Sequence, residues 1–151
     1  MATSAQDFLE QWHKVVGSQQ INILDTLLSN DIVFNTPVYL KPRKGKGLVK
    51  AILASAANIF QDFKYYNEWV SADGLNFCLE FGATIDSGKE GKVMGLKGVD
   101  IIRLQKESDG KLRIVHFEVM LRPINAAARF GELQAVGIPK MIQKYSPGAK
   151  L

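Results

Sequence analysis

The feature that most constrains this chain is a change in its hydrophobic period near the middle. Up to Phe60, apolar residues recur at the three- and four-residue spacing of helices, whereas from Phe63 onward they alternate with polar residues. Residues 77–85 show the alternation most clearly, which indicates a strand with one buried face. Helices followed by strands that are joined by short Gly-containing turns predict an α+β domain with an antiparallel sheet.

The same periodicities place the individual elements. We expect helices over residues 7–17, 21–28 and 48–60, strands over residues 31–37, 63–71, 77–85, 92–105 and 112–121, and one or two short helices over residues 124–145, interrupted at Gly137, Ile138 and Pro139. The N-terminal helices are expected to cover one face of the sheet. Residues 1–145 are predicted to form a single domain, and residues 146–151 a flexible tail.

Composition narrows the function classes. A chain of 151 residues fits one domain, and its hydrophobic content of 46% allows a core without disulfide staples. Cys78 is the one cysteine and there are two histidines, so a zinc site built from Cys and His alone is excluded. We expect no metal and no cofactor. No apolar run approaches the ~20 residues of a membrane span, and no secretory signal is expected.

Much of the formal net charge of +4 comes from residues 41–50, which read KPRKGKGLVK. One interpretation is an anion site, because glycines before a helix can offer backbone N–H groups to phosphate. The favoured interpretation is a solvated loop between a strand and a helix. Nucleic-acid binding would also use exposed aromatic residues among the basic ones, and none is interleaved there, so no nucleic-acid partner is expected.

Several local sequences resemble the nuclear-transport-factor-2-like superfamily. Residues 33–37 (VFNTP) followed by 45–49 (GKGLV) look like its first strand, turn and third helix, and residues 98–104 (GVDIIRL) and 109–112 (DGKL) look like its final strands. Residues 119–123 (VMLRP) resemble the end of a SnoaL-like subgroup. The resemblance implies a cone-shaped, strongly curved antiparallel sheet wrapped around three N-terminal helices. It also implies a small, mostly apolar pocket.

The resemblance extends to ketosteroid isomerase, but its catalytic residues are mostly replaced. The general base would fall on Thr36, which cannot act as a base at neutral pH, the oxyanion-hole tyrosine on Trp12 and a supporting tyrosine on Leu53. The protonated aspartate is retained as Asp100. The steroid isomerase mechanism is therefore not expected. The acid that related cyclases and epoxide hydrolases carry on the last strand is also missing, because the corresponding face shows Val115, Phe117 and Val119.

Asp100 is the first candidate catalytic residue. At period two it shares an apolar face with Leu96 and Ile102, where burial should raise its pKa and allow it to donate a proton or a hydrogen bond. The alternative is a structural aspartate paired with backbone N–H groups or with Arg122. His13, at the edge of the first helix's apolar stripe, is either a proton partner or a half-exposed boundary residue. The predicted substrate-binding residues are Trp12, Tyr39, Phe60, Phe81, Val115, Phe117 and Val119.

These residues favour a cofactor-independent enzyme of the isomerase, cyclase or lyase type. It would use acid catalysis on a small apolar molecule, polyketide- or terpenoid-like. The alternatives are a non-catalytic binding module and a dimeric adaptor.

A homodimer through the outer sheet face is expected, because that face still carries Val99, Ile101, Ile114 and Met120. Ala149-Lys150-Leu151 is similar to the Ser-Lys-Leu peroxisomal address, so we expect a peroxisomal protein if the source is eukaryotic and a cytoplasmic one otherwise.

Overall fold

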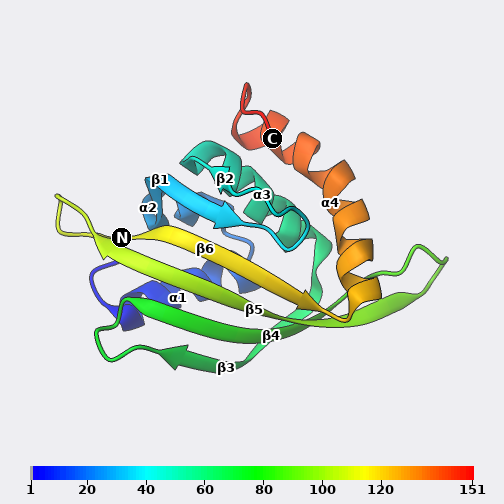
Figure 1. Ribbon diagram of the computed structural model, residues 1–151, viewed down its shortest axis with the longest axis horizontal. Coiled ribbons are helices and arrows are strands. Elements are labelled where there is room, and N and C mark those ends of the chain that lie inside the picture. The colour runs from blue at the N-terminus through cyan, green and yellow to red at the C-terminus, as the bar shows by residue number, and fades with distance from the viewer. Residues whose placement is uncertain (1) are drawn as a thin grey trace.

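The computed structural model describes residues 2–151, which form one curved sheet with the helices on its concave side (Figure 1). The helices are α1 (Ala5–Gly17), the 3₁₀ turn η1 (Ile21–Ile23), α2 (Leu24–Leu27), α3 (Lys46–Ile59) and α4 (Ile124–Tyr145). The strands are β1 (Leu28–Asn35), β2 (Arg43–Lys44), β3 (Gln61–Val70), β4 (Asn76–Asp86), β5 (Val93–Lys106) and β6 (Leu112–Arg122). The predicted fold class, a curved sheet wrapped around helices, is confirmed.

The sheet has the strand order β2-β1-β6-β5-β4-β3. Strands β3 to β6 form the predicted antiparallel meander, with β4 pairing β5 from Asn76↔Arg103 to Asp86↔Val93. Strand β1 runs parallel to β6, which the prediction of an antiparallel sheet did not include. A parallel pair needs a long connection, and here α3 carries the chain from β1 to the opposite edge before the meander returns to β1.

Bulges in β3 and β6 help to decide which side chains face the helices. In β3 the pairing shifts between Tyr65↔Phe81 and Asn67↔Glu80, so Tyr66 is an extra residue and the inward positions change from Phe63 and Tyr65 to Glu68. In β6 the pairing with β5 shifts between Leu104↔Ile114 and Arg103↔His116, which leaves Val115 as the extra residue. The expectation that Ile114 lies on the outer face is therefore wrong, because its side chain is fully buried.

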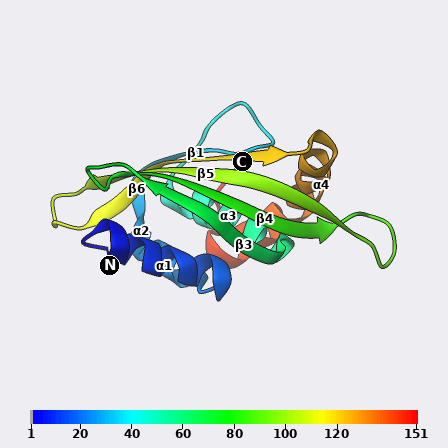
Figure 2. The same cartoon turned by 90° about the horizontal axis from the view of Figure 1, so that it is seen from below.

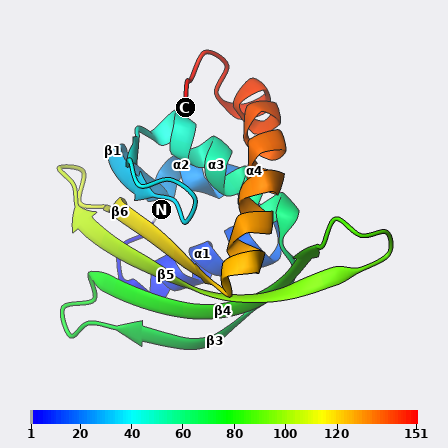
Figure 3. The same ribbon diagram turned by 45° about the vertical axis from the view of Figure 1, so that its right-hand side comes forward.

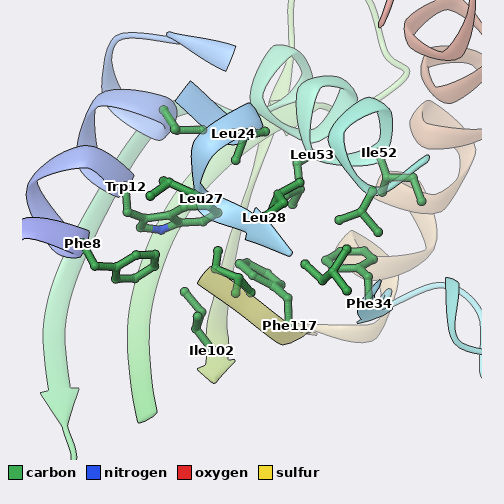
Figure 4. Close-up of a cluster of buried hydrophobic side chains, with 14 of the residues drawn as sticks. Phe8, Trp12, Leu24, Leu27, Leu28, Phe34, Ile52, Leu53, Ile102 and Phe117 are labelled. Atoms are coloured by element: carbon green, nitrogen blue, oxygen red, sulfur yellow. The ribbon is translucent and has the colours of Figure 1, made fainter. Parts of the chain in front are cut away.

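Helix α1 is capped by Ser4, whose hydroxyl accepts a hydrogen bond from the Asp7 backbone N–H (3.1 Å). Its apolar side buries Phe8, Trp12 and Val15 against the sheet. Figure 2 shows α1 and α3 on the same side of the sheet, and Figure 4 shows Trp12 close to side chains of β1 and β6 in the main core. The concave face is thus covered by apolar side chains from several helices.

Helix α4 is one continuous helix of 22 residues, and the predicted interruption at Gly137–Pro139 is wrong. Pro139 removes one N–H donor from the helix, yet Ile138 beside it is buried and holds the helix against the core. Gly137 is needed for close packing, since a Cβ there would collide with Ser55 Oγ of α3. Figure 3 shows α4 standing beside α3 with its first turns at the sheet.

The residues after α4 continue the packing. The Ser146 backbone N–H donates to the Ile142 carbonyl (2.8 Å), and Ala149 packs against the main core. Among residues 2–151, no helix is both long and apolar enough to cross a membrane.

Candidate functional site

A largely apolar cavity lies between the concave face of the sheet and helices α1, α3 and α4. The space inside it that the centre of a water-sized molecule can occupy is about 60 Å³, and its mouth opens to solvent. Trp12, Phe60 and Phe117 form much of its aromatic wall. Within residues 2–151, Asp100 supplies the only acidic side chain that lines it, and Leu151 at the end of the chain also contributes to the wall. Such a cavity, apolar with few polar groups, is typical of a site for a small molecule.

Strand β5 positions Asp100 at the centre of the sheet. Its register partners are Leu79 of β4 and Val119 of β6, and its side chain points to the concave face with 5% of the residue exposed. The Tyr65 hydroxyl donates to Asp100 Oδ2 (2.5 Å), and Trp12 Nε1 donates to the Tyr65 oxygen (2.8 Å). A chain of hydrogen bonds therefore runs from α1 through β3 to the carboxyl group.

Burial raises the pKa of Asp100 to about 7, although the hydrogen bond from Tyr65 opposes part of that rise. Burial and the neighbouring Asp100 charge raise the pKa of Tyr65 well above its ordinary value, so Tyr65 keeps its proton and remains a donor. In the described chain Asp100 has no ion-pair partner, and Arg122, the alternative partner considered from sequence, is exposed. Near neutral pH the acid and the carboxylate are therefore both populated.

The other carboxyl oxygen of Asp100, Oδ1, accepts no hydrogen bond from residues 2–151, and it is not enclosed by protein atoms. Because Asp100 lines the cavity, Oδ1 is the oxygen that a bound molecule can reach. One oxygen is thus fixed by the protein while the other is available. This arrangement can donate or accept a proton at a defined position.

His13 lies outside the cavity. Its Nε2 lies 2.8 Å from Glu68 Oε2, and 45% of its side chain is exposed. The ring centroids of His13 and Tyr65 are 5.8 Å apart, so His13 borders the back of the hydrogen-bond chain and does not reach Asp100. The bulge in β3 explains the pairing, because it turns Glu68 toward α1.

Most of the predicted binding residues share the cavity, namely Trp12, Tyr39, Phe60, Phe117 and Val119. Phe81 does not line it, because Phe81 lies behind Phe60 and Phe63 in a second apolar cluster. Val115 does not line it either, because it is the bulged residue of β6.

Sequence reasoning missed Tyr65 and Gln134. Tyr65 could have been found from the period-two alternation that begins at Phe63 and places Tyr65 opposite Phe81. Gln134 could have been found from the helical spacing of Ala126, Phe130 and Ile138, which puts it on the buried face of α4.

The fold brings together, around the cavity, the four positions that correspond to the catalytic residues of ketosteroid isomerase. These positions are occupied by Trp12, Thr36, Leu53 and Asp100. Thr36 Oγ1 accepts hydrogen bonds from the backbone N–H groups of Val38 (3.2 Å) and Tyr39 (3.1 Å), which is a turn-stabilising role. A tyrosine hydroxyl is still present beside the aspartate. It comes from β3 rather than from α1 or α3.

Comparison with known proteins agrees with this fold. The model of the SnoaL-like domain matches residues 9–116. A steroid delta-isomerase from Pseudomonas aeruginosa has a similar structure, with 35% identity, a TM-score of 0.78 and coverage of 92% of this chain and 94% of that one.

An uncharacterised protein with a cystatin-like fold from Silicibacter pomeroyi DSS-3 shares 25% identity, with a TM-score of 0.73 and coverage of 91% and 90% of the two chains. A protein provisionally assigned as a polyketide cyclase from Pseudomonas putida KT2440 shares 15% identity, with a TM-score of 0.61 and coverage of 81% of this chain and 93% of that one, which shows the fold alone. No match was found among curated proteins. Because the family model spans more than half of its length, the chain belongs to the SnoaL-like domain family.

Proposed function

We propose that this protein is a cofactor-independent enzyme of the isomerase, cyclase or lyase type that uses Asp100 as an acid on a small apolar molecule. The observation that carries the proposal is the state of Asp100. Its carboxyl group is buried in an apolar cavity, with Oδ2 held by Tyr65 and Oδ1 left for a ligand. A polyketide- or terpenoid-like skeleton suits such walls.

The pKa of Asp100, about 7, suits proton transfer at neutral pH, where both the acid and its conjugate base are populated. The acid form would give its Oδ1 proton to a carbonyl oxygen as electron density shifts there. The carboxylate that remains would be stabilised by the Tyr65 hydroxyl on Oδ2. Tyr65 retains its own proton throughout, because its pKa is raised.

The likeness to a steroid delta-isomerase supports unsaturated ketones as the first substrates to test. In this cavity Thr36 cannot abstract a proton, and among residues 2–151 no second acidic side chain lines the wall. If the protein moves a double bond, the reaction would start from the carboxylate form of Asp100, which would take the proton from one carbon and, as the acid, return it to another.

The alternative is a binding module of the same fold, in which Asp100 only anchors a ligand hydroxyl or carbonyl group. The absence of a second acidic side chain or a histidine from the described cavity wall favours this alternative. We also propose a homodimer through the outer sheet face. Three large apolar residues of that face, Tyr66, Trp69 and Met120, each have at least half of their surface exposed, and a second copy of the chain could cover them. Sedimentation at micromolar concentration tests it, and a monomer would contradict it.

The enzymatic proposal is tested with a panel of cyclic ketones whose double bond is one carbon out of conjugation. Formation of the conjugated ketone is followed by its ultraviolet absorbance. Asp100→Asn should lower turnover by ~10²-fold or more while the fold is retained. The matched control is Glu118→Gln on the outer side of β6, which should be neutral. Binding without turnover, with affinity unchanged in Asp100→Asn, would support the binding module instead.

A further inference from the structure

A second polar side chain, Gln134, borders the same cavity from the helical wall. It lies on the buried side of α4 with Phe130 and Ile138, and only 4% of it is exposed. Burying an amide among apolar side chains is costly unless its polar atoms find partners. The position of Gln134 therefore requires an explanation.

One half of the amide is held in place by the protein. Ser55 Oγ, from α3, donates a hydrogen bond to Gln134 Oε1. Gly137, one turn further along α4, leaves room for that hydroxyl, since a Cβ there would collide with Ser55 Oγ. The amide carbonyl is thus oriented toward α3 by two features of the packing.

The other half of the amide has no protein partner. In residues 2–151 Gln134 Nε2 donates no hydrogen bond, and this atom is not sealed off by the surrounding side chains. Because Gln134 lines the cavity, its N–H groups are available to a molecule inside. Asp100 comes from the sheet and Gln134 from α4, so the two polar groups belong to different walls, with aromatic side chains such as Phe117 and Phe130 also lining the space.

We propose that Gln134 is a second polar anchor, whose Nε2 donates a hydrogen bond to an oxygen of the ligand while Asp100 meets another. The ligand class that fits is an apolar ring system with two oxygen acceptors at separate positions, one of them a carbonyl. This inference rests on the proposed function for the role of Asp100, and it adds the specificity determinant at the second position.

The experiment measures the affinity of matched phenols by titration calorimetry. The compounds are built on two scaffolds, naphthol and hydroxybiphenyl. Each scaffold carries either an acetyl or an ethyl group on the ring that does not bear the hydroxyl. The two scaffolds therefore place the acetyl carbonyl at two different distances from the hydroxyl. In the wild type the acetyl compound of at least one scaffold should bind about five-fold more tightly than its ethyl partner, as expected for one neutral hydrogen bond. In Gln134→Leu that ratio should fall to about one.

Two further variants make the result specific. Gln143→Leu, an exposed glutamine of the same helix, should keep the wild-type ratio. Ser55→Ala keeps the amide but releases its carbonyl, so the ratio should decrease without vanishing. Circular dichroism on each variant confirms that α4 is intact. An acetyl-to-ethyl ratio that Gln134→Leu leaves unchanged, or no binding of either acetyl compound to the wild type, would overturn the inference.

The same compounds separate this inference from the proposed function. In Asp100→Asn the acetyl-to-ethyl ratio should persist, because that ratio reports the second position alone. If the ratio depends on Gln134 but no ketone is turned over, the second anchor stands and the catalytic proposal fails. If ketones are turned over through Asp100 but the ratio ignores Gln134, only the second anchor is wrong.

Discussion

Tyr65 and Asp100 belong to strands that are not neighbours, yet the Tyr65 hydroxyl donates to Asp100 Oδ2 across 2.5 Å. Strand β4 lies between them, so the contact reaches across the concave face of the sheet rather than along a strand pair. Trp12 fixes the tyrosine oxygen from α1. Burial raises the pKa of Asp100, and this contact, made by elements far apart in the chain, opposes part of that rise.

The stability of the fold should decrease as pH rises. The pKa of Asp100 is raised from 3.8 to about 7, so between these values the folded protein holds more protons than the unfolded chain. Below the unfolded-state pKa of 3.8 the neutral acid makes its full contribution to the free energy of unfolding, and this contribution is lost as pH rises through the folded-state pKa of about 7. The free energy of unfolding changes by roughly 4 kcal/mol at most over this range. Urea unfolding of the wild type and Asp100→Asn at pH 5 and pH 8 measures it. Parallel pH dependence in the two proteins would contradict the prediction.

Tyr65→Phe should shift the pH profile of any Asp100-dependent activity to higher pH. The tyrosine hydroxyl lowers the pKa of Asp100 by hydrogen bonding to its charged form, so removing it raises that pKa further. The measurement is kcat/KM as a function of pH, with Tyr66→Phe on the exposed side of β3 as the control. An unshifted midpoint would mean that Tyr65 only packs against Asp100.

His13→Ala should change little. Its pairing with Glu68 is partly exposed, and such pairs contribute about 0–1 kcal/mol. Turnover should stay within about two-fold of the wild type, since His13 does not line the cavity. Thermal unfolding and the ketone assay test both statements. A loss of activity comparable to that of Asp100→Asn would restore His13 as a proton partner.

Gly137→Ala should destabilise the protein by about 1–3 kcal/mol, because the new methyl group would overlap Ser55 Oγ. The same change in a Ser55→Ala background should cost much less, since the hydroxyl that causes the overlap is gone. The double-mutant cycle, measured by chemical denaturation, isolates this contact. Additive costs would show that Gly137 matters for another reason.

Sequence patterns were sufficient for the elements whose period is regular. The alternation over residues 77–85 led directly to β4 and its pairing with β5, and Asp100 was recognisable because a carboxylate interrupted an apolar face. Features that depend on tertiary packing were not accessible. Val115 could not be excluded from the cavity without knowledge of the bulge, and Pro139 marked a break that packing against α3 overrides.

The bulge at Tyr66 has a consequence for comparing members of the family. On one side of it β3 turns Phe63 and Tyr65 toward the helices, and on the other side it turns Glu68, leaving Trp69 with 54% of its surface exposed. A relative that lacks this one residue would turn the Trp69 position inward while its sheet stayed paired. Residue-by-residue identity along this strand is therefore a poor guide to shared chemistry, and relatives need to be matched by the face that each side chain occupies.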